Sequence, residues 1–374
     1  MEQSKVYFCD LRAKPGTSLQ MKLEKLIRAA GIGQIDFEKK MVAIKIHFGE
    51  PGNLSYLRPN YAKTVVDVVK SLGGRPFLTD CTTLYVGRRK DALEHMEAAY
   101  ENGFSPFSTG CHIIIGDGLK GTDEVAVPVQ GGEYVKEAKI GRAIMDADVF
   151  ISLSHFKGHE CTGFGGCIKN VGMGCGSRAG KMEQHNSGKP SISEKKCRGC
   201  GMCMKNCAQD ALQFNDAHKA VIDHDKCVGC GRCLGACNFD AIYNGNYSAN
   251  ADLNRKMAEY AKAVVDGRPA FHINLVMDIS PYCDCHAEND LPILPDVGMF
   301  ASFDPVALDQ ACVDACLKQQ PIPGSLLDEQ LHAKDFCDHH DHFVNTTPES
   351  EWQSCLEHAE KIGLGSREYE LVKI

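Results

Sequence analysis

The sequence has no apolar run long enough to cross a bilayer, since none approaches the roughly 18 residues that a membrane-spanning helix requires. The first residues, MEQSKVYFCDLRAK, also lack the charged and then apolar pattern of a signal peptide. The first absence argues against a membrane partner. The second argues against export, so we expect a cytoplasmic protein.

The chain also lacks an excess of basic charge. Its formal net charge is −8, and its Lys and Arg residues are dispersed. Because a nucleic-acid-binding face needs clustered basic side chains to contact phosphates, we expect no nucleic-acid partner. Low-complexity linkers are absent too. The 374 residues, of which 43% are hydrophobic, are enough for one large or two ordinary domains.

Cysteine, in contrast, is abundant, with 20 residues. Because no export signal is present, we expect reduced thiols in an anaerobic cell rather than disulfides. Two runs, CRGCGMCMKNC and CVGCGRCLGAC, share the spacing CxxCxxCxxxC. This spacing lets three neighbouring thiolates hold three corners of a cubane while a more distant thiolate holds the fourth. We therefore predict two 4Fe-4S clusters in a chain that is too long to be a ferredoxin alone.

The two runs are expected to share their ligands, because in two-cluster bacterial ferredoxins the fourth cysteine of each run binds the other cluster. A pair of zinc sites is the alternative, since CxxC pairs also form zinc ribbons, but a tetrahedral zinc needs only four ligands. The duplicated run favours clusters. The predicted ligands are Cys197, Cys200, Cys203 and Cys237 for one cluster, and Cys227, Cys230, Cys233 and Cys207 for the other.

On both sides of the cysteine runs, β-branched apolar stretches alternate with helical patterns, which is typical of α/β proteins. Strands are predicted at residues 5–9, 41–47, 76–80, 112–115, 149–154 and 271–278. Helices are predicted at residues 18–30, 61–72, 89–102, 141–147 and 250–265, and after Phe303. Asp304-Pro305 has the form of an N-cap followed by a first-turn proline, so Asp304 is expected to be structural.

We predict an α/β fold with a parallel or mixed sheet and flanking helices, interrupted by an inserted two-cluster module that resembles bacterial ferredoxins. The first part of the α/β domain covers residues 1–191, the module residues 192–246, and the second part residues 247–374. The alternative is two separate α/β domains with the module as a hinge.

Polar residues end four of the predicted strands. Lys45 and His47, Asp80, His155 and Asp278 would converge if these strands run parallel, because ligands bind beyond the carboxyl ends of such strands. A cap or turn former is the alternative for each residue.

The segment from His155 to His185 is unusually rich in glycine and is predicted to be a binding or catalytic loop. Glycine density leaves backbone N–H groups free to face an anion or a planar cofactor. The segment has no P-loop, dinucleotide fingerprint or HExxH motif. A plain glycine-rich connection with incidental histidines is the alternative. The candidate cofactor-binding residues are Gly163, Gly165, Gly166, Lys169, Gly172, Gly174 and His185.

Two further groups of residues could bind metal. Cys161, Cys167, Cys175, Cys283 and Cys285 could hold another metal or cluster, although buried thiols acting as small apolar residues are the alternative. The histidine-rich HAKDFCDHHDHF segment could chelate a transition metal, or could be a solvated polar loop.

Several strings together resemble the iron-sulfur proteins of the family catalogued as domain of unknown function 362. They are KIHFGEPGN, LTDCTTLYVGRRKDA, HFKGHECTGFGGCIKNVGMGCGSRAGK and FASFDPVALDQAC, and the resemblance runs from about Val42 to Cys316. It implies the fold and the cluster content more strongly than a reaction.

A fainter resemblance links the glycine-rich segment, His155 to His185, to the nickel-pincer lactate racemases. His159, Gly163-Phe164, Lys169 and His185 have the spacing of that family's motif. The resemblance implies an acid–base role for His159, cofactor anchoring by Lys169 and nickel binding by His185. Cys167 replaces a glycine of that motif, and the racemases have no cysteine insert.

The residues themselves favour an enzyme in which the clusters relay single electrons to a small molecule or an additional metal or organic cofactor. Clusters transfer no protons, so acid–base groups must come from elsewhere. No flavin or nicotinamide signature is visible, so a soluble ferredoxin is the expected electron donor. The alternatives are an electron carrier or maturation partner, and a racemase-like redox-neutral enzyme. The candidate catalytic residues are His47, His155, His159, Lys169 and Lys45.

Overall fold

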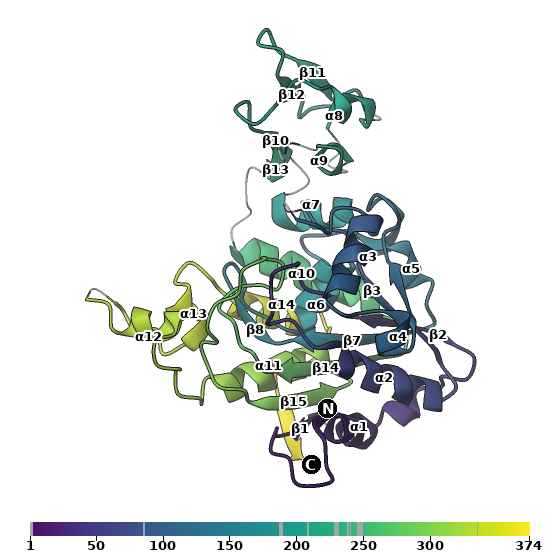
Figure 1. The fold of residues 1–374 in the computed structure, drawn as a ribbon, viewed down its shortest axis with the longest axis vertical. Coiled ribbons are helices and arrows are strands. Elements are labelled where there is room, and N and C mark those ends of the chain that lie inside the picture. The colour runs from purple at the N-terminus through teal and green to yellow at the C-terminus, as the bar shows by residue number, and fades with distance from the viewer. Residues whose placement is uncertain are drawn as a thin grey trace.

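The computed structural model describes residues 3–84, 87–186, 190–207, 209–227, 232–237, 239, 241–244, 250–334 and 336–374. Its centre is an eight-stranded sheet (Figure 1). Within this sheet every pairing is parallel except the two made by β15. In spatial order the strands are β16 (Tyr369–Lys373), β1 (Ser4–Cys9), β15 (Gly298–Ser302), β14 (Ala270–Val276), β7 (Val149–His155), β2 (Met41–Lys45), β3 (Arg75–Asp80) and β4 (His112–Ile115).

Strands from both sides of the cysteine runs belong to this one sheet. β14 pairs with β7, where Leu275 lies opposite His155, and β15 pairs with β1. The two parts therefore form a single α/β unit. The prediction of a parallel or mixed sheet is confirmed in its mixed, mostly parallel form.

Helices cover both faces of the sheet, because its strands are apolar on both sides. Along β2, Val42 and Ile44 point into one core, while Ala43 points into the other. The first core contains α1 (Leu19–Ala29) and α2 (Pro59–Ser71). The second contains α10 (Asn250–Val265), α11 (Pro305–Cys316) and α14 (Gln353–Lys361).

Capping residues define two of these helices. The side chain of Ser18 accepts from the backbone N–H of Met21 at the start of α1, and Asp304 accepts from Val306 and Ala307 at the start of α11. The structural role predicted for Asp304 is thus confirmed. The shorter elements are η1 (Ile32–Gln34), α3 (Ala92–Glu101), α4 (Pro106–Thr109), β5 (Glu124–Pro128), β6 (Glu137–Gly141), α5 (Arg142–Met145), α12 (Leu326–Leu331) and α13 (His342–Thr346).

The glycine-rich segment is more regular than the predicted loop. It forms a hairpin of β8 (Lys157–His159) and β9 (Gly163–Gly165), followed by α6 (Cys167–Cys175) and α7 (Arg178–Asn186). Helix α6 packs closely on α10, since a Cβ at Gly172 would lie 2.0 Å from the carbonyl oxygen of Met257. Glycine at this position serves helix packing, so tertiary contacts override the low helix propensity of the segment.

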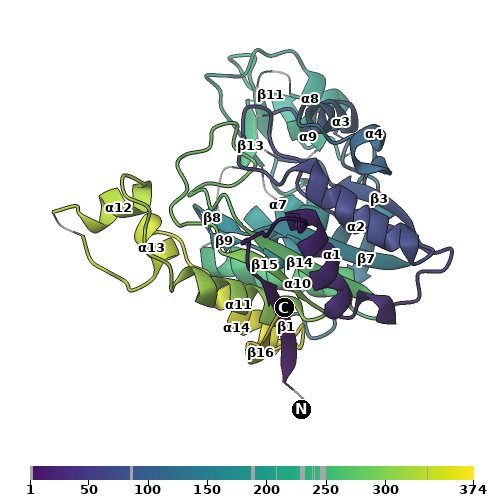
Figure 2. The same cartoon turned by 60° about the horizontal axis from the view of Figure 1, so that its bottom comes forward.

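The part of the chain that carries the two cysteine runs, from β10 to β13 (residues 190–244), is called the cysteine segment. It extends from the α/β body beyond α7 (Figures 1 and 2). Its strands form two antiparallel pairs, in which β10 (Pro190–Ile192) pairs with β13 (Ile242–Asn244), and β11 (Leu212–Phe214) pairs with β12 (Ala220–Ile222). Two short helices accompany them, α8 (Met202–Lys205) and α9 (Arg232–Gly235). Among the helices of the described residues, none has the length and apolarity needed to cross a membrane.

Candidate functional site

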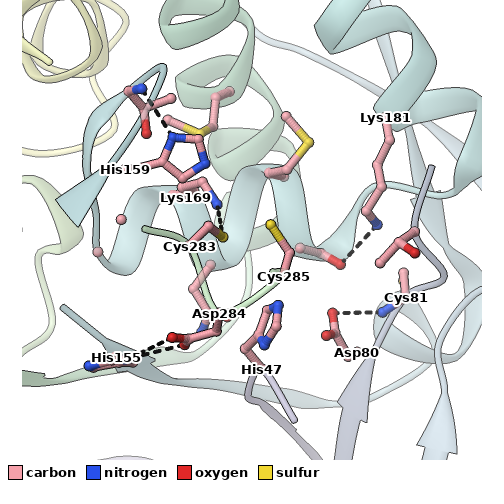
Figure 3. A pocket seen from close by; sticks show the side chains of 18 of the residues that line it. His47, Asp80, Cys81, His155, His159, Lys169, Lys181, Cys283, Asp284 and Cys285 are labelled. Carbon is pink, nitrogen blue, oxygen red and sulfur yellow. Dashed lines mark hydrogen bonds and ion pairs between the residues drawn. The ribbon is translucent and has the colours of Figure 1, made fainter. Parts of the chain in front are cut away.

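A cavity lies at the carboxyl ends of β2, β3, β7 and β14, where parallel strands place their ligands. We call it the cation-lined cavity, because Lys45, Arg89, Lys157, Lys169 and Lys181 all line it (Figure 3). Of the sequence-predicted residues, it brings together Lys45, His47, His155, His159, Gly165, Gly166, Lys169, Gly174 and His185. Gly163 and Gly172 are not part of its lining.

Lys45 and Asp80 form a buried ion pair at the end of adjacent strands. The Lys45 Nζ lies 3.0 Å from Asp80 Oδ1 and donates to Asn170 Oδ1 at 2.8 Å. Burial favours the neutral carboxyl group, yet the Lys45 ammonium holds the pKa of Asp80 well below its usual value. Lys45 is therefore committed to an internal ion pair, and its predicted catalytic role would require this pair to open.

His47 faces a buried guanidinium. Its Nε2 lies 2.9 Å from Arg89 Nη1, and Arg89 also binds Glu50 through Nε at 2.8 Å. Because a guanidinium only donates, the Nε2 of His47 carries no proton there. Burial and the Arg89 charge lower the pKa of His47 well below its usual value. His47 is thus held neutral and lies against a cation.

Both ring nitrogens of His155 are hydrogen-bonded. Its Nδ1 lies 3.0 Å from each carboxylate oxygen of Asp284, and its Nε2 lies 2.8 Å from the Met277 carbonyl oxygen. Although burial opposes ionisation, the His155 charge holds the pKa of Asp284 well below its usual value. With acceptors at both nitrogens, the ring donates twice as an imidazolium. His155 therefore positions Asp284 and has no free nitrogen for substrate.

The β8–β9 hairpin places His159 and Lys157 over the cavity. The Nδ1 of His159 accepts from the backbone N–H groups of Cys161 and Thr162, at 3.0 and 3.2 Å, so the ring proton resides on Nε2. Lys157 is buried, and its closest carboxylate, Asp284, is 3.9 Å away. His159 can present a donor N–H, and Lys157 a cation, to a bound molecule.

Two glycines leave space for the side chains of Lys157 and Lys45. A Cβ at Gly165 would lie 2.7 Å from Lys157 Nζ, and a Cβ at Gly174 would lie 2.6 Å from Lys45 Nζ. Gly163, which has a φ of +69°, instead packs against Trp352, and Gly172 packs against α10. The predicted cofactor-binding glycines thus divide into residues that border the cavity and residues that serve packing.

Asp309 holds the start of α6, the helix that carries Lys169. Its carboxylate accepts from the backbone N–H groups of Cys167 and Ile168, at 2.7 and 2.8 Å, and from Asn274 at 2.7 Å. A Cβ at Gly166 would lie 2.4 Å from this carboxylate. The buried Asp309 therefore occupies the N-terminus of α6, so these two N–H groups are not available to an anion in the cavity.

Cys283 and Cys285 follow β14 and line the same cavity (Figure 3). Lys169 Nζ lies 3.4 Å from Cys283 Sγ. A hydrogen bond from Cys285 lowers the pKa of Cys283 well below its usual value, as do the charges of Lys169 and Lys157, although burial opposes them. These contacts favour the thiolate form of Cys283, which distinguishes it from an inert buried thiol; a thiolate is also the form in which cysteine binds a metal.

The other cysteines of the glycine-rich segment behave as buried thiols. Burial raises the pKa of Cys161 to about 11 and of Cys175 to about 12, and it also raises that of Cys167. This agrees with the alternative of small apolar residues.

Helix α7 connects the cavity with the cysteine segment. Lys181 and His185 of α7 line the cavity, where Lys181 Nζ donates to the Gly176 carbonyl oxygen at 2.5 Å. Burial and nearby cations lower the pKa of His185 to about 3, so its ring is neutral. Met182, also on α7, packs in an apolar cluster with Leu84, Cys197, Cys203 and Cys233.

A second cavity lies within the cysteine segment. Its wall is apolar, with Ile192, Ala220 and Ile242 among its residues. Backbone N–H groups point at the sulfurs, since Ala220 donates to Cys197 Sγ at 3.4 Å and Ala241 to Cys237 Sγ at 3.3 Å. Four of the predicted cluster ligands line it together, namely Cys197, Cys200, Cys203 and Cys237.

The ligands predicted for the other cluster are described less fully. Cys207 accepts from the backbone N–H of Ala211 at 3.4 Å. Cys227 and Cys233 are described, whereas Cys230 lies outside the described residues. In the described part of the chain, no three His, Cys, Asp or Glu side chains converge on one point as the ligands of a single metal ion would. Cluster cysteines hold four separate irons, so they need not converge in this way.

The histidine-rich segment near the C-terminus has structural roles where the structure describes it. Asp341 caps α13 and accepts from Trp352 Nε1 at 2.7 Å, and His342 Nε2 lies 3.0 Å from the Gln319 carbonyl oxygen. The side chains of His332 and His340 are largely exposed. Among the described residues of this segment, the His, Cys and Asp side chains do not gather around a common centre.

Sequence reasoning missed several cavity residues. Arg89, Lys157 and Lys181 line the cavity but were not singled out, and Asp284 was not separated from its neighbours. Only the Cys-Asp-Cys triplet after a predicted strand gave a signal in this region. The lysines gave none, because a lysine in a polar segment ordinarily faces solvent.

Comparisons with known proteins give a family and distant structural likenesses. No curated protein sequence matches this chain. The lactate racemase apoprotein from Thermoanaerobacterium thermosaccharolyticum is 12% identical, with a TM-score of 0.40 over 100% of this chain and 83% of the racemase. A crystal structure of a Thermotoga maritima protein is 14% identical, with a TM-score of 0.39 over 80% of this chain. The chain spans 57% of that protein's length.

The sequence also matches a family model. The model of the family described as domain of unknown function (DUF362) matches residues 42–314, which include the cation-lined cavity's strands and the whole cysteine segment. Since this match covers most of the sequence, the protein belongs to the DUF362 family.

Proposed function

We propose that this protein is an iron-sulfur oxidoreductase in which two 4Fe-4S clusters relay single electrons to a small molecule in the cation-lined cavity. The observation that carries this proposal is the position of α7. One side of this helix presents Lys181 and His185 to the cavity, while Met182 packs among cysteines of the duplicated runs. Helix α7 would thus link a redox group in the cysteine segment to the cavity.

The cysteine segment fits a cluster in its donor set and surroundings. Four cysteines around one apolar cavity would each bind one iron of a cube. The backbone N–H groups of Ala220 and Ala241 would stabilise charge on the sulfurs of Cys197 and Cys237. Cys200 is exposed, so electrons could enter at this edge from a soluble ferredoxin. The clusters themselves would supply electron transfer without protons.

The cavity fits an anionic small molecule. Five cationic side chains line it, but Asp80 and Asp284 are the only carboxylates among the described lining residues. An additional metal or organic cofactor is the other candidate occupant of this lining. Lys157 and Lys169 would hold the anion, and His159 would donate a hydrogen bond from Nε2 to the charge that develops as the substrate is reduced.

The proposal is tested by anaerobic reduction of the clusters, followed by addition of candidate anionic substrates while cluster absorbance is monitored. We expect His159→Gln and Lys169→Gln to slow substrate-dependent reoxidation by about a hundredfold or more, as loss of a charge-stabilising donor or anchor does. The surface variant Lys120→Gln is the matched control. Cluster absorbance should be the same in all variants. Reoxidation at the wild-type rate in both cavity variants would contradict the proposal, and reoxidation by partner proteins alone would favour the electron-carrier alternative.

A further inference from the structure

The Cys283–Asp284–Cys285 triplet is fixed firmly at the edge of the cavity. The backbone N–H of Glu50 donates to the Asp284 carbonyl oxygen at 2.9 Å, and His286 N–H donates to the Cys283 carbonyl oxygen at 3.1 Å. The Asp284 side chain is held by His155. With the central residue anchored in this way, both flanking cysteines contribute to the cavity lining.

Three cationic or donor groups surround the sulfur of Cys283. Lys169 Nζ donates to it at 3.4 Å, and Lys157 and His159 line the same part of the cavity. Figure 3 shows His159 and Lys169 next to Cys283. A thiolate is the nucleophilic form of cysteine, and cations of this kind stabilise it. At Cys81 burial outweighs the charge of Lys181 and raises the pKa above the usual value, and burial also raises the pKa of Cys312 and Cys316.

Cys285 is the protonated partner of Cys283. Its pKa is raised well above the usual value by its hydrogen bond with Cys283 and by burial. One thiolate and one thiol, two residues apart in one turn, form a pair in which the first attacks and the second resolves. Such pairs exchange with disulfides through a mixed-disulfide intermediate.

We propose that Cys283 and Cys285 are a redox-active dithiol that reduces a small anionic disulfide in the cation-lined cavity. This inference rests on the proposed function for its electron source and names the substrate class. Cys283 thiolate attacks one sulfur of the substrate, forms a mixed disulfide and releases the first product as a thiolate. Cys285 loses its proton to water and attacks Cys283 Sγ, which releases the second product thiolate and leaves a Cys283–Cys285 disulfide.

Two electrons and one proton then restore the thiolate and the thiol. Each 4Fe-4S cluster transfers a single electron, so one electron from each of two clusters, supplied in turn by ferredoxin, balances the reduction of one disulfide. Two one-electron clusters beside a two-electron dithiol thus give a reason for the duplicated cysteine run. The cations Lys157, Lys169 and Lys181 select a substrate that carries carboxylates or similar anionic groups.

The test uses 5,5′-dithiobis(2-nitrobenzoate), a small disulfide with carboxylates that releases a coloured thiolate, on anaerobic protein with its clusters intact. All variants, including the one called wild type here, carry Cys337→Ser, because Cys337 is an exposed thiol that would itself react. We expect the wild type to show a fast phase of about two coloured thiolates per chain and a Cys283–Cys285 disulfide in its peptide map. Cys285→Ser should release about one and retain the mixed disulfide on Cys283. Cys283→Ser should lose the fast phase, whereas the matched control Cys175→Ser, a buried thiol, should keep it.

A fast phase that persists in Cys283→Ser, or a wild-type pair that stays as two free thiols in oxidising dithiothreitol buffer, would overturn the inference. Thiol exchange with the probe requires no cluster. Protein with full iron and no disulfide would therefore refute the dithiol alone, whereas protein with the disulfide and no iron would refute the electron source alone.

Discussion

At the carboxyl ends of the central strands, whether a cationic side chain is available to a ligand depends on the side chain next to it. Lys45 is neutralised by Asp80, and His155 by Asp284, so neither cation is available to a ligand. Lys169 differs, because its neighbour is a sulfur. Burial alone would lower the pKa of Lys169, but the Cys283 charge raises it above its usual value. The lysine and the thiolate therefore stabilise each other's charged forms.

Replacing Lys169 should make Cys283 less reactive. In Lys169→Gln the thiolate loses a donor and a positive charge, so we expect the pKa of Cys283 to rise. Its alkylation by iodoacetamide should be slower at neutral pH, and the pH–rate profile should move toward alkaline pH. The measurement is the alkylation rate of Cys283 by peptide mass spectrometry, with Lys120→Gln as the control. An unchanged pH profile would show that Lys169 does not stabilise the thiolate.

Asp284→Asn should destabilise the fold strongly. It leaves His155 buried without its counterion, and breaking a buried pair costs about 3–5 kcal/mol. In the folded state the pKa of Asp284 is depressed, so its stabilising contribution is present above the unfolded pKa of about 3.9 and is lost as pH falls below it. The difference in the free energy of unfolding between Asp284→Asn and wild type, measured in urea, should therefore be largest near neutral pH.

The control for Asp284 is Asp278→Asn. Asp278 is partly exposed and lies 3.7 Å from Arg58, so we expect a loss of less than about 1 kcal/mol. Equal stability of Asp284→Asn and wild type at neutral pH would contradict the buried ion pair.

At the scale of elements, the position of α6 decides where Lys169 lies. Its N-terminus is held by Asp309, its middle packs on α10 at Gly172, and its C-terminal part passes Lys45 at Gly174. Each of these contacts joins segments that are far apart in sequence. The helix is thus placed by tertiary contacts rather than by its own propensity.

Gly172→Ala should destabilise the protein even though alanine favours helices. The added Cβ would lie 2.0 Å from the Met257 carbonyl oxygen, so α6 and α10 would have to separate. We expect a loss of about 1–3 kcal/mol or more in the free energy of unfolding. Gly33→Ala, where the added Cβ meets nothing within 4 Å, should change it by less than about 1 kcal/mol. A neutral Gly172→Ala variant would refute this packing.

Asp309 should give α6 a pH-dependent anchor. Burial raises the pKa of Asp309 from 3.8 to about 6, although its hydrogen bonds oppose this. The folded state therefore binds the proton more tightly, and the stability contributed by Asp309 falls as pH rises from about 4 to about 6. Relative to Asp309→Asn, wild type should lose roughly 2–3 kcal/mol across this range. A difference that is independent of pH, as expected for the control Gly33→Ala, would contradict the assignment.

The sequence predicted those elements whose pattern is local. The strand at His112–Ile115, the helix at Asn250–Val265 and the Asp304 cap are found where they were expected. The hairpin and the two helices of the glycine-rich segment were not foreseen, because contacts with α10, Asp309 and Trp352 fix them.

The candidate site was predictable to a similar extent. Parallel strands were expected to bring Lys45, His47, Asp80, His155 and Asp278 together. The first four line the cavity, whereas Asp278 does not. The state of Cys283 could not be foreseen, because it depends on Lys169, which lies in a distant part of the sequence. Local sequence shows residue types but not these long-range neighbours.

At the scale of the whole molecule, the single sheet contains strands from both sides of the cysteine runs. The cysteine segment is therefore inserted into one α/β body (Figures 1 and 2). The sheet and its two cores are built without the cysteine segment. Changes in the proposed cluster ligands should therefore leave the α/β body folded. This separation allows the proposed redox centres to be tested without disturbing the cavity.

The most direct measurement is the iron and acid-labile sulfide content per chain of anaerobically purified protein, compared with that of Cys237→Ser. Two 4Fe-4S clusters require about eight iron and eight sulfide per wild-type chain. Because Cys237 shares its cavity with Cys197, Cys200 and Cys203, the variant should retain about four of each. Wild-type protein that holds zinc without sulfide would contradict the proposed electron relay.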